Sequence, residues 1–198
     1  MGKSRGSKLG RKGIVFRYSR PYDEMLGMMM GKQIADSFAA KEFLQQLEAL
    51  WKKEGDSILR EIERASGLKF REKLDCYVVQ QMLFEAISHP FTVRMHRHVE
   101  KMRGILVHEL MHILLVQHGA AASRIVNSLD GGSEFKMHFP VLLCERRVLE
   151  KLYGGFQQEK RVENLDEVWK AVNKVYPAFQ HYQHGVLRFV QDVARGKI

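Results

Sequence analysis

The hydrophobic pattern along the chain first predicts a few short strands. Apolar and β-branched residues cluster at 14–18 and at 74–79, lengths that are typical of single strands. At 91–95, apolar and polar residues alternate with a period of two, which predicts a strand buried on one face. Residues 80–87 fit either a continuation of the second strand or a helix, and the pattern leaves this choice open.

Most of the remaining chain follows a helical period. Apolar stripes with helix start and stop signals predict helices at 38–55, 56–66, 99–119, 140–153, 165–175 and 178–194. The breaks are placed at glycines and prolines, with Pro140 as a first helical residue and Pro177 as a stop. Residues 21–31 read as irregular. The pattern therefore predicts a helix-rich α+β fold with a small sheet.

The helix predicted at 99–119 differs from the others because it is apolar on every side. Between positions 105 and 117 its only ionisable residues are His108, Glu109 and His112. Burying such groups is costly unless they are paired or coordinated. Residues four apart share one side of a helix, so both imidazoles could bind one ion, while Glu109 lies about 100° round the axis. The simpler alternative is a core helix whose polar groups form ordinary hydrogen bonds.

The sequence His108-Glu109-Leu110-Met111-His112 resembles the active-site helix of the zincin metallopeptidases. The resemblance implies a Zn²⁺ site with His108 and His112 as metal ligands. It also implies hydrolysis of peptide bonds by a metal-bound water, with Glu109 as the catalytic general base. In such enzymes the substrate adds to the edge of a sheet beside the active helix, and residues 91–95 are the candidate edge strand.

A third ligand is needed, and the preferred candidate is Glu145. It falls on the apolar stripe of the helix predicted at 140–153, whereas Arg146, Arg147 and Glu150 fall on the opposite side. A carboxylate that faces inward requires a cation. The arrangement resembles the gluzincins, whose third ligand is a glutamate on a second, downstream helix.

Other candidates for the third ligand remain open. His118 has the spacing of the metzincin pattern, but Leu115 occupies the position of the helix-breaking glycine. His138 and Glu134 precede the predicted ligand helix. His138 or Tyr153 could instead stabilise the oxyanion of the reaction.

Charge adds one further feature. The chain of 198 residues has a net charge of +9, and five of its basic residues lie within residues 1–13, which contain no acid. This glycine-rich segment predicts a disordered basic arm that contacts nucleic acid or another polyanion, or only aids solubility. Residues 14–155 are predicted to form the zincin-like domain and residues 156–198 a C-terminal helical extension packed on it.

Location and class are inferred from features that the sequence lacks. No apolar run reaches the length of a membrane span, and the first residues lack the apolar core of a signal peptide. Cys76 and Cys144 make no disulfide framework, so the expected location is the cytoplasm. The predicted function is a zinc metallopeptidase that acts on a peptide or protein substrate. The alternatives are a non-catalytic metal-binding relative, or a basic helical nucleic-acid-binding protein in which the motif is fortuitous.

Overall fold

The computed structural model describes residues 13–32, 37–156 and 165–198. The basic arm predicted at 1–13 therefore lies outside the described residues apart from Gly13. Residues 157–164, within the predicted C-terminal extension, also lie outside them.

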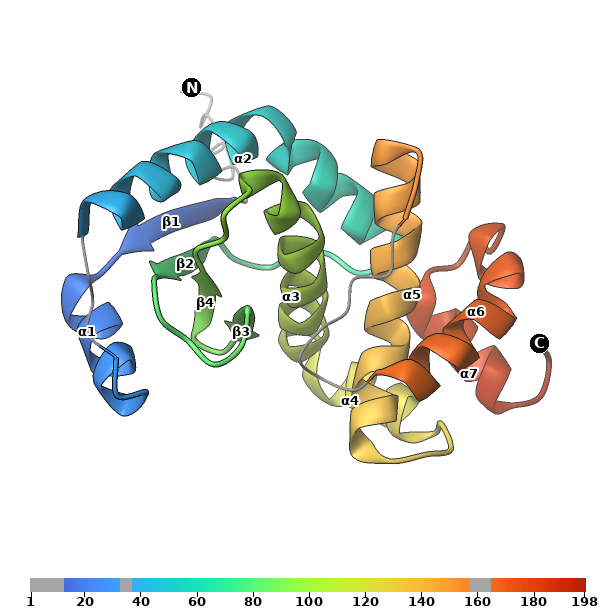
Figure 1. The fold of residues 1–198 in the computed structure, drawn as a ribbon. Helices are drawn as coiled ribbons and strands as arrows, with labels where there is room; N and C mark the ends of the chain where they lie inside the picture. The colour runs from blue at the N-terminus through green and yellow to red at the C-terminus, as the bar shows by residue number, and fades with distance from the viewer. Residues whose placement is uncertain (1–12, 33–36, 157–164) are drawn as a thin grey trace, which may run out of the picture.

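The described residues form a helix-rich α+β fold with one small mixed sheet, which confirms the predicted fold class at this level (Figure 1). In chain order the elements are β1 (Ile14–Tyr18), α1 (Arg20–Met29), α2 (Ser37–Ser66), β2 (Leu74–Val79), β3 (Ala86–Ser88), β4 (Phe91–Arg94), the 3₁₀ turn η1 (Val99–Lys101), α3 (Met102–Gln117), α4 (Gly119–Asn127), α5 (Ser133–Tyr153), α6 (Asp166–Gln180) and α7 (Val186–Ala194).

The sheet has the strand order β1-β2-β4-β3. β1 and β4 both run parallel to β2, whereas β3 runs antiparallel to β4. The prediction that 91–95 forms an exposed edge is wrong, because β4 lies between β2 and β3. Thr92, expected on the solvent face, is fully buried and contacts the hydroxyl of Tyr22 at 3.2 Å. The outer strand on this side of the sheet is β3, which also contacts α3.

Two helical boundaries in the first half of the chain were predicted incorrectly. Residues 21–31, expected to be irregular, contain most of α1, which begins with proline in its first turn. The break expected at Gly55 is absent, and α2 continues through it. An added Cβ at Gly55 would lie 2.5 Å from the ring of Trp51. The glycine is therefore required by side-chain packing rather than by a helix end.

α3 is the central helix of the structure. It contacts α2, α4, α5, η1 and β3, and every residue from Ile105 to Met111 is buried. Burial on all sides agrees with its nearly continuous apolar sequence. The chain then turns at Gly119, which has φ +48°, into a separate helix α4 that the sequence pattern did not predict.

The next helix is longer at its N-terminus than predicted. α5 begins at Ser133 rather than at Pro140, so the proline lies inside the helix. Pro140 cannot donate the usual hydrogen bond to the fourth preceding carbonyl, but its flanking residues are buried and packing maintains the helix. This earlier helix start places His138 on α5. α5 lies beside α3 (Figure 1).

The C-terminal helices pack on α5 and on the elements around it. α6 contacts α5, and α7 contacts α4, α5 and α2. The stop predicted at Pro177 is wrong, because α6 continues to Gln180. The last helix begins at Val186, after a turn at Gly185.

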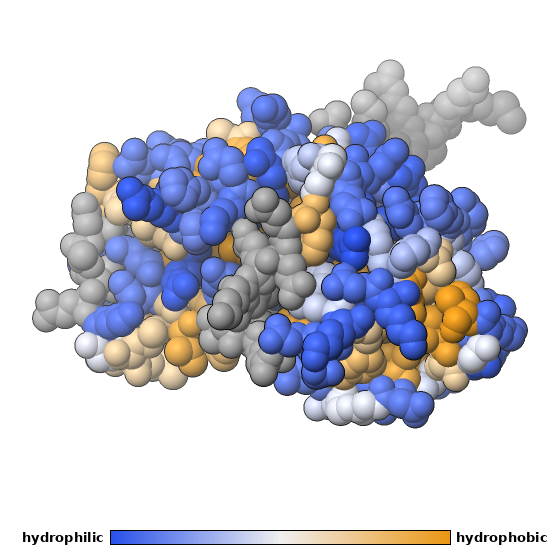
Figure 2. All heavy atoms as spheres, turned by 45° about the vertical axis from the view of Figure 1, so that its right-hand side comes forward, coloured by the Kyte–Doolittle hydropathy of each residue, from blue (hydrophilic) through white to orange (hydrophobic). Residues whose placement is uncertain are grey.

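The surface is mainly hydrophilic on the face drawn in Figure 2, with separate hydrophobic patches along its lower part. Among the described residues, no single helix is long and apolar enough to cross a membrane. Only α3 with its preceding turn and α4, taken together, satisfy that test, and they are bent by 107° relative to each other.

Candidate metal centre

Three histidines from two helices meet in the interior. His108 and His112 come from α3 and His138 from α5, and one ring nitrogen of each lies within 4.8 Å of the other two. The Nε2 atoms of His108 and His112 are 3.1 Å apart. His108 and His138 are buried, with exposed fractions of 2% and 7%, while His112 is partly accessible. Of the described residues, only this group has a metal-ligand arrangement.

Two of these rings are oriented by hydrogen bonds from their Nδ1 atoms. His108 donates from Nδ1 to the Oε2 atom of Glu145 at 2.8 Å, and both side chains are at most 5% exposed. His138 donates from Nδ1 to the backbone carbonyl of Glu134 at 3.0 Å. A neutral imidazole that donates from Nδ1 keeps the lone pair on Nε2. Outer acceptors of this kind fix the tautomer and orientation of metal-binding histidines.

The spacing of two of the three rings fits a divalent ion. Imidazole ligands lie about 2.0–2.1 Å from zinc, so two of them on a tetrahedral ion are separated by roughly 3.3 Å. The 3.1 Å between Nε2 of His108 and Nε2 of His112 is close to this value. Protonating all three rings would instead concentrate positive charge at one buried point, which is unfavourable. The three-histidine group could thus hold a metal ion, with Glu145 supplying a nearby negative charge.

Glu145 and His138 were both candidates for the third ligand, and the structure places them differently around His108. Glu145, predicted as the third ligand, contacts the outer nitrogen of His108, and the group whose ligand atoms converge is completed by His138. The geometry therefore favours His138 over Glu145 as third ligand. A sequence signal existed: the two residues are seven positions apart, which is about two helical turns, so one helix places both on the same face. Because the helix was predicted to begin at Pro140, His138 fell outside it and the shared face was not recognised.

Glu109 is a buried residue of α3. It is 9% exposed, and its charge acts on the thiol of Cys76 in β2, one of the two inner strands of the sheet. Burial, and secondarily the charge of Glu109, raise the pKa of the Cys76 thiol well above its usual value. Cys76 is not part of the three-histidine group.

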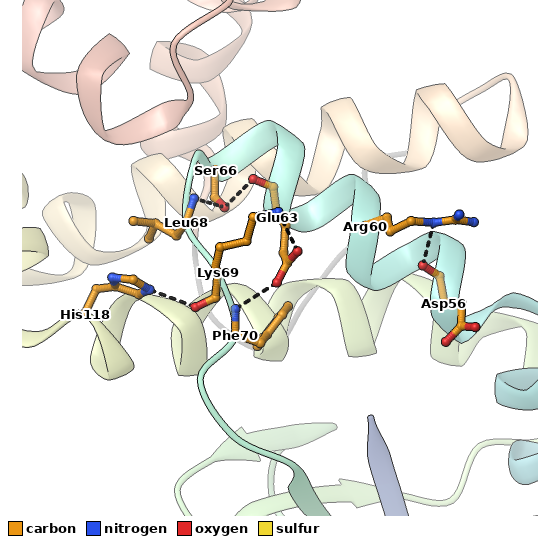
Figure 3. A network of polar contacts seen from close by, with 8 residues as sticks. All are labelled: Asp56, Arg60, Glu63, Ser66, Leu68, Lys69, Phe70 and His118. Atoms are coloured by element: carbon orange, nitrogen blue, oxygen red, sulfur yellow. Dashed lines mark hydrogen bonds and ion pairs between the residues drawn. The ribbon is translucent and has the colours of Figure 1, made fainter. Parts of the chain in front are cut away.

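His118, the alternative with metzincin spacing, is used elsewhere. It ends α3, and its Nε2 donates to the backbone carbonyl of Lys69 at 2.9 Å. Figure 3 shows this contact with the segment that follows α2. In the same segment, the backbone N–H of Phe70 donates to the side chain of Glu63, which lies near the end of α2. His118 therefore joins α3 to the end of α2, and it is not part of the three-histidine group.

Tyr153, considered as an oxyanion-stabilising residue, belongs to a different polar cluster. Its hydroxyl donates to Glu54 at 2.7 Å, and the guanidinium of Arg103 binds both oxygens of the same carboxylate at 2.7 Å. Burial raises the pKa of Tyr153, and the hydrogen bond to Glu54 adds to this effect. This cluster links α2, α3 and α5 and is a structural feature of their junction.

Comparisons with protein-family models, with curated proteins and with solved structures find no match to this chain.

Proposed function

We propose that the protein is a zinc-dependent metallopeptidase with His108, His112 and His138 as ligands and Glu109 as general base. The observation that supports this proposal is the convergence of three imidazoles, two from α3 and one from α5. Glu109 follows His108 directly on α3. Three protein ligands leave a fourth position of a tetrahedral ion for water or substrate.

The choice of zinc rests on the donor chemistry. Three neutral imidazole nitrogens suit zinc and related transition metals, whereas magnesium and calcium prefer oxygen ligands. Glu145 complements the site by accepting from His108, which raises the basicity of that ligand and compensates positive charge in a buried place.

The chemistry assigned to this chain is proton transfer by Glu109. A divalent cation supplies Lewis acidity that makes water nucleophilic near neutral pH. The Glu109 carboxylate accepts a proton from the attacking water and delivers it to the amine nitrogen that leaves when the C–N bond breaks. The buried surroundings of Glu109, only 9% exposed, limit competing water at this carboxylate.

A peptide substrate is supported by β3 rather than by the strand predicted from the sequence. Arg94 donates its backbone N–H to the carbonyl of Glu85, and hydrogen-bonded pairs alternate along antiparallel strands. The backbone N–H and C=O of Ile87, which is paired with Thr92, therefore also point toward β4. The backbone groups of Ala86 and Ser88, between and beyond these pairs, consequently point toward the outer edge of the sheet. An extended peptide can add to such an edge as a further strand.

The proposal is tested by removing the base while keeping the metal. The zinc-loaded protein is expected to cleave members of a broad peptide library, whereas Glu109→Gln cleaves them about 10²- to 10⁴-fold more slowly and retains its zinc. Glu100→Gln, at an exposed position just before α3, is the matched control and should keep full activity. Equal rates in Glu109→Gln and wild type would exclude the general-base role. Bound zinc with no cleavage of any peptide would favour the non-catalytic alternative.

A further inference from the structure

A pocket of about 410 Å³ opens directly beside the metal centre, with His112 in its wall. The other walls come from the end of α3, from α4 and from the first turns of α5. The apolar side chains that line it are those of Leu115, Val116, Ala122, Val126 and Met137. The pocket is therefore continuous with the proposed catalytic site and mainly apolar.

The hollow results from the sharp turn between α3 and α4. The two helices are bent by 107°, and Gly119 adopts φ +48° at the turn, with no atom near the position of a Cβ. α4 thus leaves the axis of α3, and α5 closes the space from the other side. Val116 and Met137 remain 58% and 48% exposed. A mainly apolar pocket with a few polar groups in its wall is typical of a ligand-binding site.

The ionisable side chains that line the pocket are all basic. Among the described lining residues, Lys136 is the only one besides His112 that is ionisable, and there is no carboxylate. Lys136 spans from α5 to the end of α4, where its Nζ donates to the carbonyl of Asn127 at 3.3 Å. A basic side chain in this space would meet a like charge in apolar surroundings, which is unfavourable.

We infer that this pocket receives a large apolar side chain of the peptide, from a residue next to the bond that is cleaved. The enzyme is then selective for residues such as leucine and phenylalanine and selective against lysine and arginine. This inference rests on the proposed function, since it names the substrate class of that site. The volume exceeds that of one leucine side chain, so aromatic side chains also fit.

The test measures peptide binding without relying on hydrolysis. Zinc-loaded Glu109→Gln is titrated calorimetrically with short peptides in which one residue, flanked by glycines, is alanine, leucine, phenylalanine or lysine. Leucine and phenylalanine peptides should bind at least about tenfold more tightly than the alanine peptide, and the lysine peptide no more tightly. Adding Ser123→Trp, at an exposed lining position, should remove this preference. Adding Ala121→Trp, exposed on the same helix but not in the lining, should preserve it.

Equal affinity for all these peptides, absence of binding by any of them, or an unchanged preference with Ser123→Trp would overturn the pocket assignment. The proposed peptidase function can be refuted independently of the pocket assignment. Selective binding by Glu109→Gln with no hydrolysis by the wild type would leave the pocket in place and remove the peptidase. Hydrolysis without a preference for apolar residues would support the peptidase function and exclude the pocket assignment.

Discussion

Replacing Glu145 and His138 in parallel distinguishes an outer residue from a ligand. Glu145 contacts Nδ1 of His108, so Glu145→Gln keeps a hydrogen-bond acceptor of similar size but removes the charge. Losing such an outer partner costs about 10- to 100-fold in metal affinity, or about 1.4–2.8 kcal/mol. We therefore expect Glu145→Gln to bind zinc measurably more weakly than wild type while still binding it.

His138→Ala should have a larger effect because it removes one of three ligands. Zinc sites with four ligands bind with about 10–16 kcal/mol in total, which corresponds to roughly 2.5–4 kcal/mol for each ligand. The affinity of His138→Ala should accordingly fall by about 70- to 900-fold. The larger loss of zinc affinity is thus expected for the histidine substitution.

Competition between the protein and a chromophoric zinc chelator measures both affinities on one scale. Glu134→Gln is the control, because the exposed side chain changes whereas the backbone carbonyl that holds His138 stays. Circular dichroism of each metal-free variant establishes that the helices are retained. The reasoning is refuted if Glu145→Gln abolishes zinc binding while His138→Ala binds as the wild type does. Glu145 would then be the third ligand.

Two further predictions concern stability. Gly185 has φ +77° and ψ 165°, and an added Cβ would lie 2.5 Å from the carbonyl oxygen of Ser66, so Gly185→Ala should destabilise the fold by at least about 3 kcal/mol. The control Gly154→Ala, with no atom near the added Cβ, should cost only about 1 kcal/mol. Equal losses of the two variants in urea unfolding would disprove the packing argument. The guanidinium of Arg103, hydrogen bonded to Glu54, lowers the pKa of that carboxyl from its ordinary 4.5, so Glu54→Gln should cost about 2 kcal/mol near neutral pH. That difference from wild type should be complete above about pH 4.5 and should diminish as the pH falls below it; a difference that does not change with pH would contradict the ion-pair assignment.

The central helix was the most predictable part of the structure from sequence. Its continuous apolar surroundings required burial, and the spacing of His108 and His112 placed both on one side of α3 whatever the rest of the chain did. Local patterns therefore suffice where one element carries both the chemistry and the reason for burial. The strands at 14–18 and 74–79 were also predictable, because their short runs of apolar and β-branched residues match buried strands.

The errors arose where tertiary packing overrides local signals. Gly55 looks like a helix end, yet the ring of Trp51 occupies the space beside it. Pro140 looks like a helix start, yet buried neighbours on both sides keep α5 continuous. That second error separated His138 from Glu145, so the shared face of the two residues on α5 was not recognised. The sheet order, which makes β3 rather than β4 the outer strand, depends on long-range pairing that no local pattern records.

The central claim is that one zinc ion is held by three imidazoles from α3 and α5. Anomalous diffraction at the zinc edge, recorded from crystals of the zinc-loaded protein, tests it most directly. The account predicts a single peak about 2.0–2.1 Å from a ring nitrogen of each of His108, His112 and His138, with Glu145 outside the coordination sphere. A peak bound to the Glu145 carboxylate without His138, or no peak near these histidines, would contradict it.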